Sequence, residues 1–256
     1  MLEDDLRSLK ACSLTCKIMF ISARRIIHRK IYLTWKNNWG LLTVPERERC
    51  LRGEEQEFVF RVLPTFAGHG LLPYARHLFI HVNNNFTPAN LQPFNHHFQC
   101  FNQIQELNVH WFDTPGFLEN FDNFFANFVP TLRSLHLDTP AGDTRDILDF
   151  ICRFPHLDDL TFKSTSASPS YRNLGTFPVV DTTPPFRGSL KLSGITERSR
   201  GLLQQLVSLP GECHFRSIAL RNCEPAAEQL IVNTCRGTLE SISITRGTHG
   251  ECRSIL

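Results

Sequence analysis

The sequence predicts an α/β fold in which parallel strands alternate with helices and stack into a curved solenoid. Two observations support this fold class: an apolar triplet recurs at a near-constant interval, and most intervals contain apolar residues at helical spacing. The triplets occupy residues 78–80, 107–109, 135–137, 160–162, 190–192, 218–220 and 242–244, so their first residues are 29, 28, 25, 30, 28 and 24 positions apart. Steps of this length hold one strand and one helix, as in a leucine-rich-repeat-like solenoid.

Each triplet is apolar at its first and third positions, which is the period of a strand with one buried face. The intervals supply the dozen or more residues that a crossover between parallel strands requires. We therefore expect the triplets to lie side by side in one parallel ladder, with the helices on its outer face.

Apolar stripes at helical spacing mark the expected helices. The clearest stripe consists of five phenylalanines, and shorter stripes follow in three later intervals. These residues, which we interpret as core packing, are Phe117, Phe121, Phe124, Phe125 and Phe128; Ile147, Leu148 and Ile151; Leu202, Leu203, Leu206 and Leu209; and Ala226, Ala227, Leu230 and Ile231. Asp143 and Glu224 stand where an N-terminal cap or a first-turn acid would stabilise a helix.

The chain is expected to divide into two parts. Residues 1–36 predict a short helical segment, with a helix over about 5–31 and a β-like run at 31–35, and residues 37–256 predict the solenoid. Residues 37–57 would link the two parts. Residues 164–187 are rich in Ser, Thr and Pro and predict an irregular insertion between repeats, because proline blocks helix continuation.

Strand alternation predicts a polar strip on the open, concave face of the ladder. Because Leu107 and Val109 should point to the core, Glu106, Asn108 and His110 should point to solvent, and the same count applies to each repeat. The candidate target-binding residues on this face are His77, His81, Glu106, Asn108, His110, His136, Asp138, Asp159, Lys163, Lys191 and Arg221. Aligned residues on neighbouring strands lie ~4.8 Å apart, so these side chains would form one continuous surface.

Composition indicates an ordinary folded protein, with 41% apolar residues, 20% charged residues and a net charge of +2. The compact basic run of Arg24, Arg25, Arg29 and Lys30 is better explained as a solvated helix face than as a nucleic-acid site. No run approaches the ~18 consecutive apolar residues of a membrane span, and the acidic start differs from a signal peptide. We therefore expect a cytoplasmic or nuclear protein whose partner is neither a nucleic acid nor a membrane.

The residues that could carry chemistry lack the spacing that known sites require. The nine cysteines are spread along the chain, which favours reduced, mostly buried thiols over disulfides. His96, His97 and Cys100 lie close together, as do Cys12 and Cys16, but neither group has a second ligand pair at zinc-finger distance. We found no phosphate loop, HExxH motif or nucleophile signature, so we expect no enzymatic activity, metal or cofactor.

Several segments resemble a known family. Residues 9–17 (LKACSLTCK), followed by 22–24 (SAR) and 31–33 (IYL), resemble the second half of an F-box of the kind found in fungal F-box proteins with degenerate leucine-rich repeats. Residues 74–78, 132–137, 155–160 and 184–190 are similar to the repeat signatures of the same proteins. The resemblance covers most of the chain, but the F-box is partial, because the family's opening Leu-Pro helix has no counterpart here. Met19 and His28 also replace aromatic residues of the family pattern.

The resemblance implies a substrate-receptor subunit of a cullin-based SCF-type ubiquitin ligase. In that family the F-box docks on a Skp-type adaptor, which links it to a cullin, and the solenoid selects the protein to be ubiquitinated. The residues that would contact the adaptor here are Leu6, Leu9, Leu14 and Ile18. The same residues could instead form a cap over the first repeat.

Two other functions stay open. A repeat scaffold without a ligase would bind a target protein on the concave face but no adaptor. An enzyme would require a pocket with converging titratable groups, and would gain support if the histidines clustered with acidic residues or cysteines in space.

Overall fold

A computed structural model provides the fold of the chain. It describes residues 28–34, 57–59, 63–82, 95–111, 125–138, 144–164, 184–209, 213–246 and 252–255, together with Ser8, Lys10, Ala23 and Ile26.

The described residues form an α/β fold built on one ten-stranded sheet in the order β10-β9-β8-β7-β6-β5-β4-β3-β1-β2. The strands from β2 to β9 pair in parallel, and β10 joins β9 in the antiparallel direction. From β3 to β10, each strand lies beside its neighbour in sequence. The strands are β1 (Lys30–Thr34), β2 (Glu57–Val59), β3 (His77–Val82), β4 (Glu106–Trp111), β5 (Ser134–Asp138), β6 (Asp159–Lys163), β7 (Ser189–Ser193), β8 (Ser217–Arg221), β9 (Ser241–Thr245) and β10 (Cys252–Ile255).

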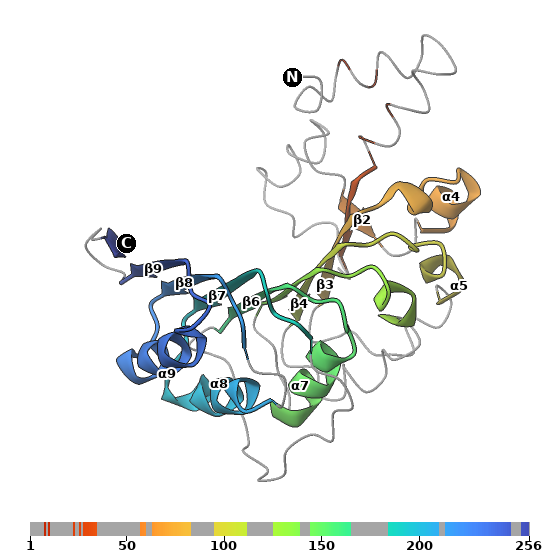
Figure 1. Ribbon diagram of the computed structural model, residues 1–256. Coiled ribbons are helices and arrows are strands. Elements are labelled where there is room, and N and C mark those ends of the chain that lie inside the picture. The colour runs from red at the N-terminus through yellow and green to blue at the C-terminus, as the bar shows by residue number, and fades with distance from the viewer. Residues whose placement is uncertain are drawn as a thin grey trace.

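Helices cover one face of this sheet. Figure 1 shows the strands side by side along a bent sheet, with α7, α8 and α9 together on one side of it. Neighbouring helices contact each other, α4 with α5, α7 with α8, and α8 with α9. The helices are α4 (Leu63–Gly68), α5 (Asn95–Phe98), α7 (Thr144–Cys152), α8 (Arg200–Val207) and α9 (Pro225–Cys235), and the 3₁₀ turns are η3 (Leu72–Tyr74), η6 (Ala126–Phe128) and η7 (Glu197–Ser199).

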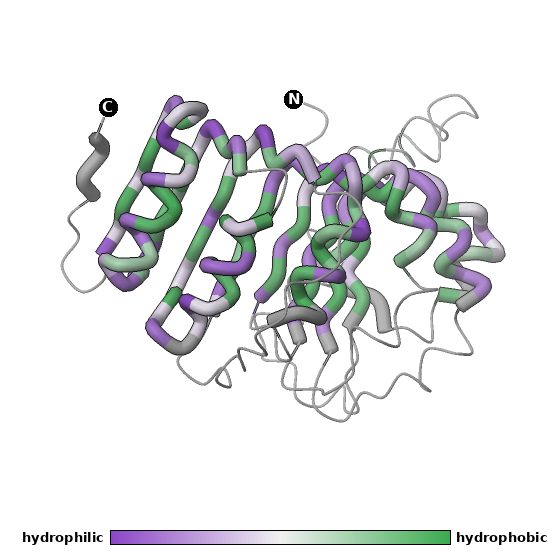
Figure 2. The backbone as a smooth tube through the Cα atoms, turned by 60° about the horizontal axis from the view of Figure 1, so that its bottom comes forward, coloured by the Kyte–Doolittle hydropathy of each residue, from purple (hydrophilic) through white to green (hydrophobic). Residues whose placement is uncertain are grey.

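The apolar triplets form the inner face of the sheet, as predicted. All seven lie in strands β3 to β9, and the first and third residues of each triplet from β3 to β8 are buried. Figure 2 shows the resulting alternation of hydrophobic and hydrophilic residues along the strands. Ile242 and Ile244 of β9 are only partly buried. The prediction of a parallel strand ladder with helices on one face is therefore confirmed.

A repeated hydrogen-bond pattern fixes the register of the strands. The carbonyl of the residue just before one strand accepts two N–H groups from the start of the next unit. The Arg29 carbonyl accepts from the N–H groups of Arg76 and His77, and the Arg76 carbonyl accepts from those of Gln105 and Glu106. The same pair of bonds recurs at the carbonyls of Gln105, Arg133, Gly188 and Arg216.

Three of the expected helices are present, and only the end of the fourth lies within the described residues. α7, α8 and α9 contain the predicted stripes, although Leu209 follows the end of α8, Ala226 is exposed and Leu230 is only partly buried. In the interval of the phenylalanine stripe, the described residues form the short turn η6, with Phe125 and Phe128 buried. Phe117, Phe121 and Phe124 lie outside the described residues. The described end of this predicted helix is therefore α-helical at Phe125 and continues into the 3₁₀ turn η6.

Glu224 occupies the N-cap position of α9, but its side chain makes no capping hydrogen bond. Its place at the start of the helix is therefore as predicted, but it does not cap the helix through a side-chain hydrogen bond. Pro225 at the first helical position needs no N–H partner, which reduces the need for a cap. The Glu224 carboxylate instead lies 3.6 Å from the Arg200 guanidinium of α8. Asp143, the other predicted cap, lies outside the described residues.

The predicted β-like run of the N-terminal segment is strand β1, which pairs with both β3 and β2. This strand therefore belongs to the same sheet as the repeats. Of the predicted insertion at residues 164–187, Ser164 and residues 184–187 are described, and Phe186 is buried against Phe215 with ring centroids 5.2 Å apart.

Gly194, directly after β7, has a φ of +69°, and an added Cβ would collide with the backbone carbonyl of Ser164. We expect Gly194→Ala to lower the free energy of unfolding by about 2 kcal/mol or more, because alanine is strained in this backbone region and the carbonyl cannot move aside. Urea unfolding monitored by circular dichroism measures the change. Gly237→Ala is the control, since its Cβ would meet nothing within 4 Å. Equal losses in the two variants would contradict the prediction.

Candidate functional site

The candidate site is the open face of the sheet, opposite the helices. The predicted residues His77, His81, Glu106, Asn108, His110, His136, Asp138, Asp159, Lys163, Lys191 and Arg221 all lie on strands β3 to β8, at positions that alternate with the buried apolar residues. They are partly or fully exposed, so the predicted parity is correct. The strands align these residues in three rows across the sheet, since each row follows the in-register pairing of adjacent strands.

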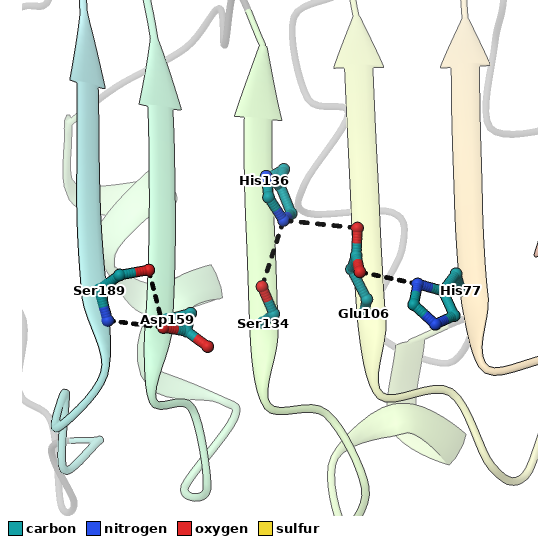
Figure 3. Close-up of polar contacts among 6 residues, drawn as sticks. All are labelled: His77, Glu106, Ser134, His136, Asp159 and Ser189. Carbon is teal, nitrogen blue, oxygen red and sulfur yellow. Dashed lines mark hydrogen bonds and ion pairs between the residues drawn. The ribbon is translucent and has the colours of Figure 1, made fainter. Parts of the chain in front are cut away.

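One group of contacts joins β3, β4 and β5. The Glu106 carboxylate lies between two histidines, with Oε2 2.7 Å from His77 Nδ1 and Oε1 3.6 Å from His136 Nε2 (Figure 3). His136 Nε2 also lies 3.2 Å from Ser134 Oγ on the same strand. Burial lowers the pKa of His136, and Lys191 and His77 lower it further, whereas Glu106 and Asp159 oppose this change. The net lowering favours a neutral His136 ring at neutral pH.

These contacts resemble a hydrolytic triad in composition but differ from one in geometry. In a Ser-His-acid triad, the acid holds one ring nitrogen while the other nitrogen accepts the serine proton. Here Ser134 and Glu106 both approach the same nitrogen of His136, Nε2. The acid therefore cannot orient this ring for proton abstraction from Ser134. The histidines do cluster with acidic residues, but the arrangement supports polar recognition better than nucleophilic catalysis.

A second group of contacts joins β3 to β6 in the row near the strand ends. The rings of His81 and His110 are 4.6 Å apart, and His110 Nδ1 lies 2.9 Å from Asp138 Oδ2. The same oxygen accepts a 2.8 Å hydrogen bond from Lys163 Nζ. Burial would raise the pKa of Asp138, but the hydrogen bonds and charges of His110 and Lys163 outweigh burial and lower it. Asp138 is therefore a charged carboxylate that links three strands.

Asp159 connects β6 to β7. Its Oδ1 accepts hydrogen bonds from the backbone N–H of Ser189 at 2.5 Å and from Ser189 Oγ at 2.8 Å (Figure 3). Gly188 permits this approach, because a Cβ at that position would collide with the same carboxylate. The Asp159 carboxylate therefore links β6 to β7, and it is also partly exposed on the open face.

Lys191 and Arg221 complete the predicted set. Both side chains are exposed, and among the described residues neither has an ion pair. Their neighbours on β7, β8 and β9 are mostly serines. Among the described residues, the open face therefore has one half, β3 to β6, with paired charged groups, and one half, β7 to β9, with two cations that form no ion pair.

Two aromatic rings and a serine on this surface were not among the predicted residues. The rings of Tyr32 and Phe79 stack 4.2 Å apart on β1 and β3, in the row of Asn108 and His136. The alternation that placed the other residues would also have placed these two rings on the open face. Ser189 was missed as well, because its contact with Asp159 depends on the register of β6 and β7.

A cleft of about 500 Å³ lies where β1, β3 and β4 begin, and the sequence did not predict it. Its lining includes Arg29, Tyr74, Arg76, Gln103 and Gln105. The Arg76 guanidinium donates a 3.3 Å hydrogen bond to the Gln103 carbonyl. The cleft therefore lies at the N-terminal ends of these strands, among the residues that precede them.

Five of the described cysteines are free thiols. Cys152, Cys213, Cys223 and Cys235 are buried, and Cys100 is partly buried. Burial raises the pKa of Cys152 and of Cys213 to about 12, so both are protonated at neutral pH and poor nucleophiles. Within the part of the chain that the structure describes, no three His, Cys, Asp or Glu residues are grouped to hold a metal ion. Cys12 and Cys16 lie outside that part.

The predicted adaptor-binding residues Leu6, Leu9, Leu14 and Ile18 also lie outside the described residues. Within the described ranges, no helix has the length and apolar character needed to cross a membrane. In the comparisons with known proteins, no protein-family model matches the chain and no curated protein matches it.

Asp138→Asn should lower the free energy of unfolding at pH 7 by about 1 to 2 kcal/mol, because it removes a charge that accepts hydrogen bonds from His110 and Lys163. Since the folded state lowers the pKa of Asp138, this stabilisation is complete above the ordinary value of 3.8 and is lost as the pH falls towards the lowered value. The difference in unfolding free energy between the variant and the unchanged protein should therefore decrease as the pH falls from 7 to 3, and urea unfolding measures it. Asp158→Asn, which removes a half-exposed carboxylate 3.9 Å from Arg133, should cost less at every pH. A difference that is independent of pH would contradict the prediction.

The pKa of His136 should respond in opposite directions to two neighbours. Glu106→Gln should lower it further, because the glutamate charge favours the protonated ring, and Lys191→Ser should raise it, because the lysine charge disfavours that ring. An NMR titration of the histidine ring signals measures both changes. Arg216→Ser, at the sheet edge beside Glu240, is the control that should leave the titration unchanged. Shifts of the same sign in the first two variants would disprove the assignment of these charges.

Proposed function

We propose that this protein is the substrate-recognition subunit of a cullin-based, SCF-type ubiquitin ligase, and that it binds its target protein on the open face of a leucine-rich-repeat-like solenoid. The observation that carries the proposal is the in-register alignment of strands β3 to β8, which brings the predicted polar residues together on one face. A surface of this extent suits a protein partner better than a small molecule.

The strand-and-connection units support the solenoid part of the proposal. Parallel strands from β3 to β9 follow one another in chain order, and the connecting helices pack against their neighbours on one side. Units that contact only the next unit are the defining feature of solenoid proteins. The exposed concave surface of such proteins commonly binds partners.

The ligase part of the proposal rests on the F-box resemblance of residues 9–17, 22–24 and 31–33. Residues 31–33 lie in β1, which pairs with β3. In our proposal the preceding residues, with Leu6, Leu9, Leu14 and Ile18, contact a Skp-type adaptor and through it a cullin. The receptor would then act by positioning its target beside a partner enzyme, without performing bond chemistry itself. Such a ligase would operate in the cytoplasm or the nucleus.

Reconstitution with a purified Skp-type adaptor and cullin tests the proposal. The full chain should co-elute with both proteins on size-exclusion chromatography. Leu9→Asp with Leu14→Asp should abolish co-elution, because charged groups cannot replace apolar contacts with the adaptor. His77→Ala with His136→Ala, which changes only the open face, should leave adaptor binding intact. If the unchanged chain fails to bind the adaptor, the ligase role is wrong, and a repeat scaffold that binds targets without a ligase becomes the better explanation.

A further inference from the structure

The half of the open face formed by β7, β8 and β9 has a composition unlike that of the other half. Its outward positions carry only small or hydroxyl side chains and two long cations. They are Ser189, Lys191, Ser193, Ser217, Ala219, Arg221, Ser241, Ser243 and Thr245. None of these nine positions is acidic, so the surface has an excess of positive charge.

The two cations of this half differ from the lysine of the neighbouring strand. Lys163 on β6 donates a hydrogen bond to Asp138, and the negative charge of this carboxylate offsets the positive charge of the lysine. Lys191 and Arg221 are exposed, and the described residues offer neither of them an ion pair. Both can therefore bind a negative group on a partner without first breaking an ion pair within the described sheet.

The register gives the two cations a defined spacing. Lys191 is opposite Ala219, and Arg221 is opposite Ser193, so Lys191 and Arg221 are diagonal neighbours on adjacent strands. Diagonal neighbours lie about 7 to 8 Å apart. In an extended peptide, alternate side chains point the same way and lie about 6.6 Å apart. Two acidic residues separated by one residue would therefore match the two cations.

The low profile of this surface allows a peptide backbone to approach it. Ser193, Ala219 and Ser243 have short side chains, and serine hydroxyls can donate hydrogen bonds to peptide carbonyls. The β3-to-β6 half instead carries imidazole and carboxylate groups that already contact each other, and the ring of Phe79, which stacks on Tyr32 of β1. An extended segment therefore meets fewer steric obstacles over β7 to β9.

We infer that β7, β8 and β9 form the docking surface for an extended acidic segment of the target protein, with Asp or Glu residues at alternate positions that pair with Lys191 and Arg221. This inference rests on the proposed function, in which the open face binds the target.

Selection from a displayed library of random decapeptides tests the inference with the purified full chain. The unchanged protein should enrich peptides with Asp or Glu at positions i and i+2. The double variant Lys191→Glu and Arg221→Glu should bind those peptides at least about tenfold more weakly and should enrich Lys or Arg instead. Raising the salt from about 50 mM to about 500 mM should also weaken binding of the selected peptides to the unchanged protein.

The matched control is Arg187→Glu with Arg236→Glu, which makes the same change in net charge at two exposed residues outside the strands. It should select the same acidic peptides as the unchanged chain. A second double variant, Lys191→Gln with Arg221→Gln, should lose acidic peptides without gaining basic ones, and circular dichroism checks that each variant is folded.

Several results would overturn the inference. One is a selection in which acidic peptides are not enriched, or in which no peptide is retained. Another is that the Lys191→Glu and Arg221→Glu variant binds the acidic peptides as tightly as the unchanged chain. A third is binding only when phosphoserine replaces the acidic residues. Selected peptides that require His77 and His136 instead would overturn the inference while supporting target binding on the open face. Adaptor binding is measured separately, so its loss would refute the ligase role without affecting this result.

Discussion

The in-register pairing of the parallel strands is the constraint on which the rest of the structure depends. The carbonyl before a strand accepts two N–H groups of the next unit, as at Arg29, Arg76 and Gln105, so each unit is positioned on the one before it. A shift of one residue would move the buried leucines to the open face and the polar residues to the core. The core and the candidate site are therefore two consequences of the same alignment.

The described helices vary more in length than strands β3 to β9, which have five or six residues each. α7, α8 and α9 have 9, 8 and 11 residues, whereas α5 has 4 and η6 has 3. Among the described residues around α5 and η6, the largest buried side chains are phenylalanine rings. Phe98, Phe101, Phe128 and Phe125 contact one another in that order, and Phe125 contacts Phe150 of α7, with ring centroids 5.1 to 6.5 Å apart. These large rings thus form a continuous apolar layer across the described parts of neighbouring connections.

The strands and their buried faces could be predicted from the sequence, because period-two alternation and a constant interval are properties of the residue pattern alone. The N-terminal strand β1 was also predicted as a β-like run. The 3₁₀ geometry of η6 could not be predicted, since the end of an apolar stripe at helical spacing fits both an α-helical turn and a 3₁₀ turn. The capping role of Glu224 failed for a tertiary reason: its side chain faces Arg200, a residue of another helix.

The residues of the candidate site could be predicted, but their interactions could not. Alternation places Glu106 and His136 on the open face, whereas the contact between them depends on which residues the register sets opposite each other. The stack of Tyr32 on Phe79 needs the additional knowledge that β1 pairs with β3 and not only with β2. Contacts between side chains from different repeats are therefore information that the pattern of one repeat does not contain.

The pairing of charges on the open face determines how each half can contribute to binding. A partner that forms an ion pair with Glu106 must displace His77 and His136. A partner that forms one with Asp138 must displace His110 and Lys163. Those exchanges return little net free energy, because one set of polar contacts replaces another. The β3-to-β6 half is thus suited to contact a partner through the faces of its rings and through the solvent-facing atoms of its hydrogen-bonded side chains. Lys191 and Arg221 need no such exchange within the described sheet, so long-range attraction of a charged partner falls mainly to the β7-to-β9 half.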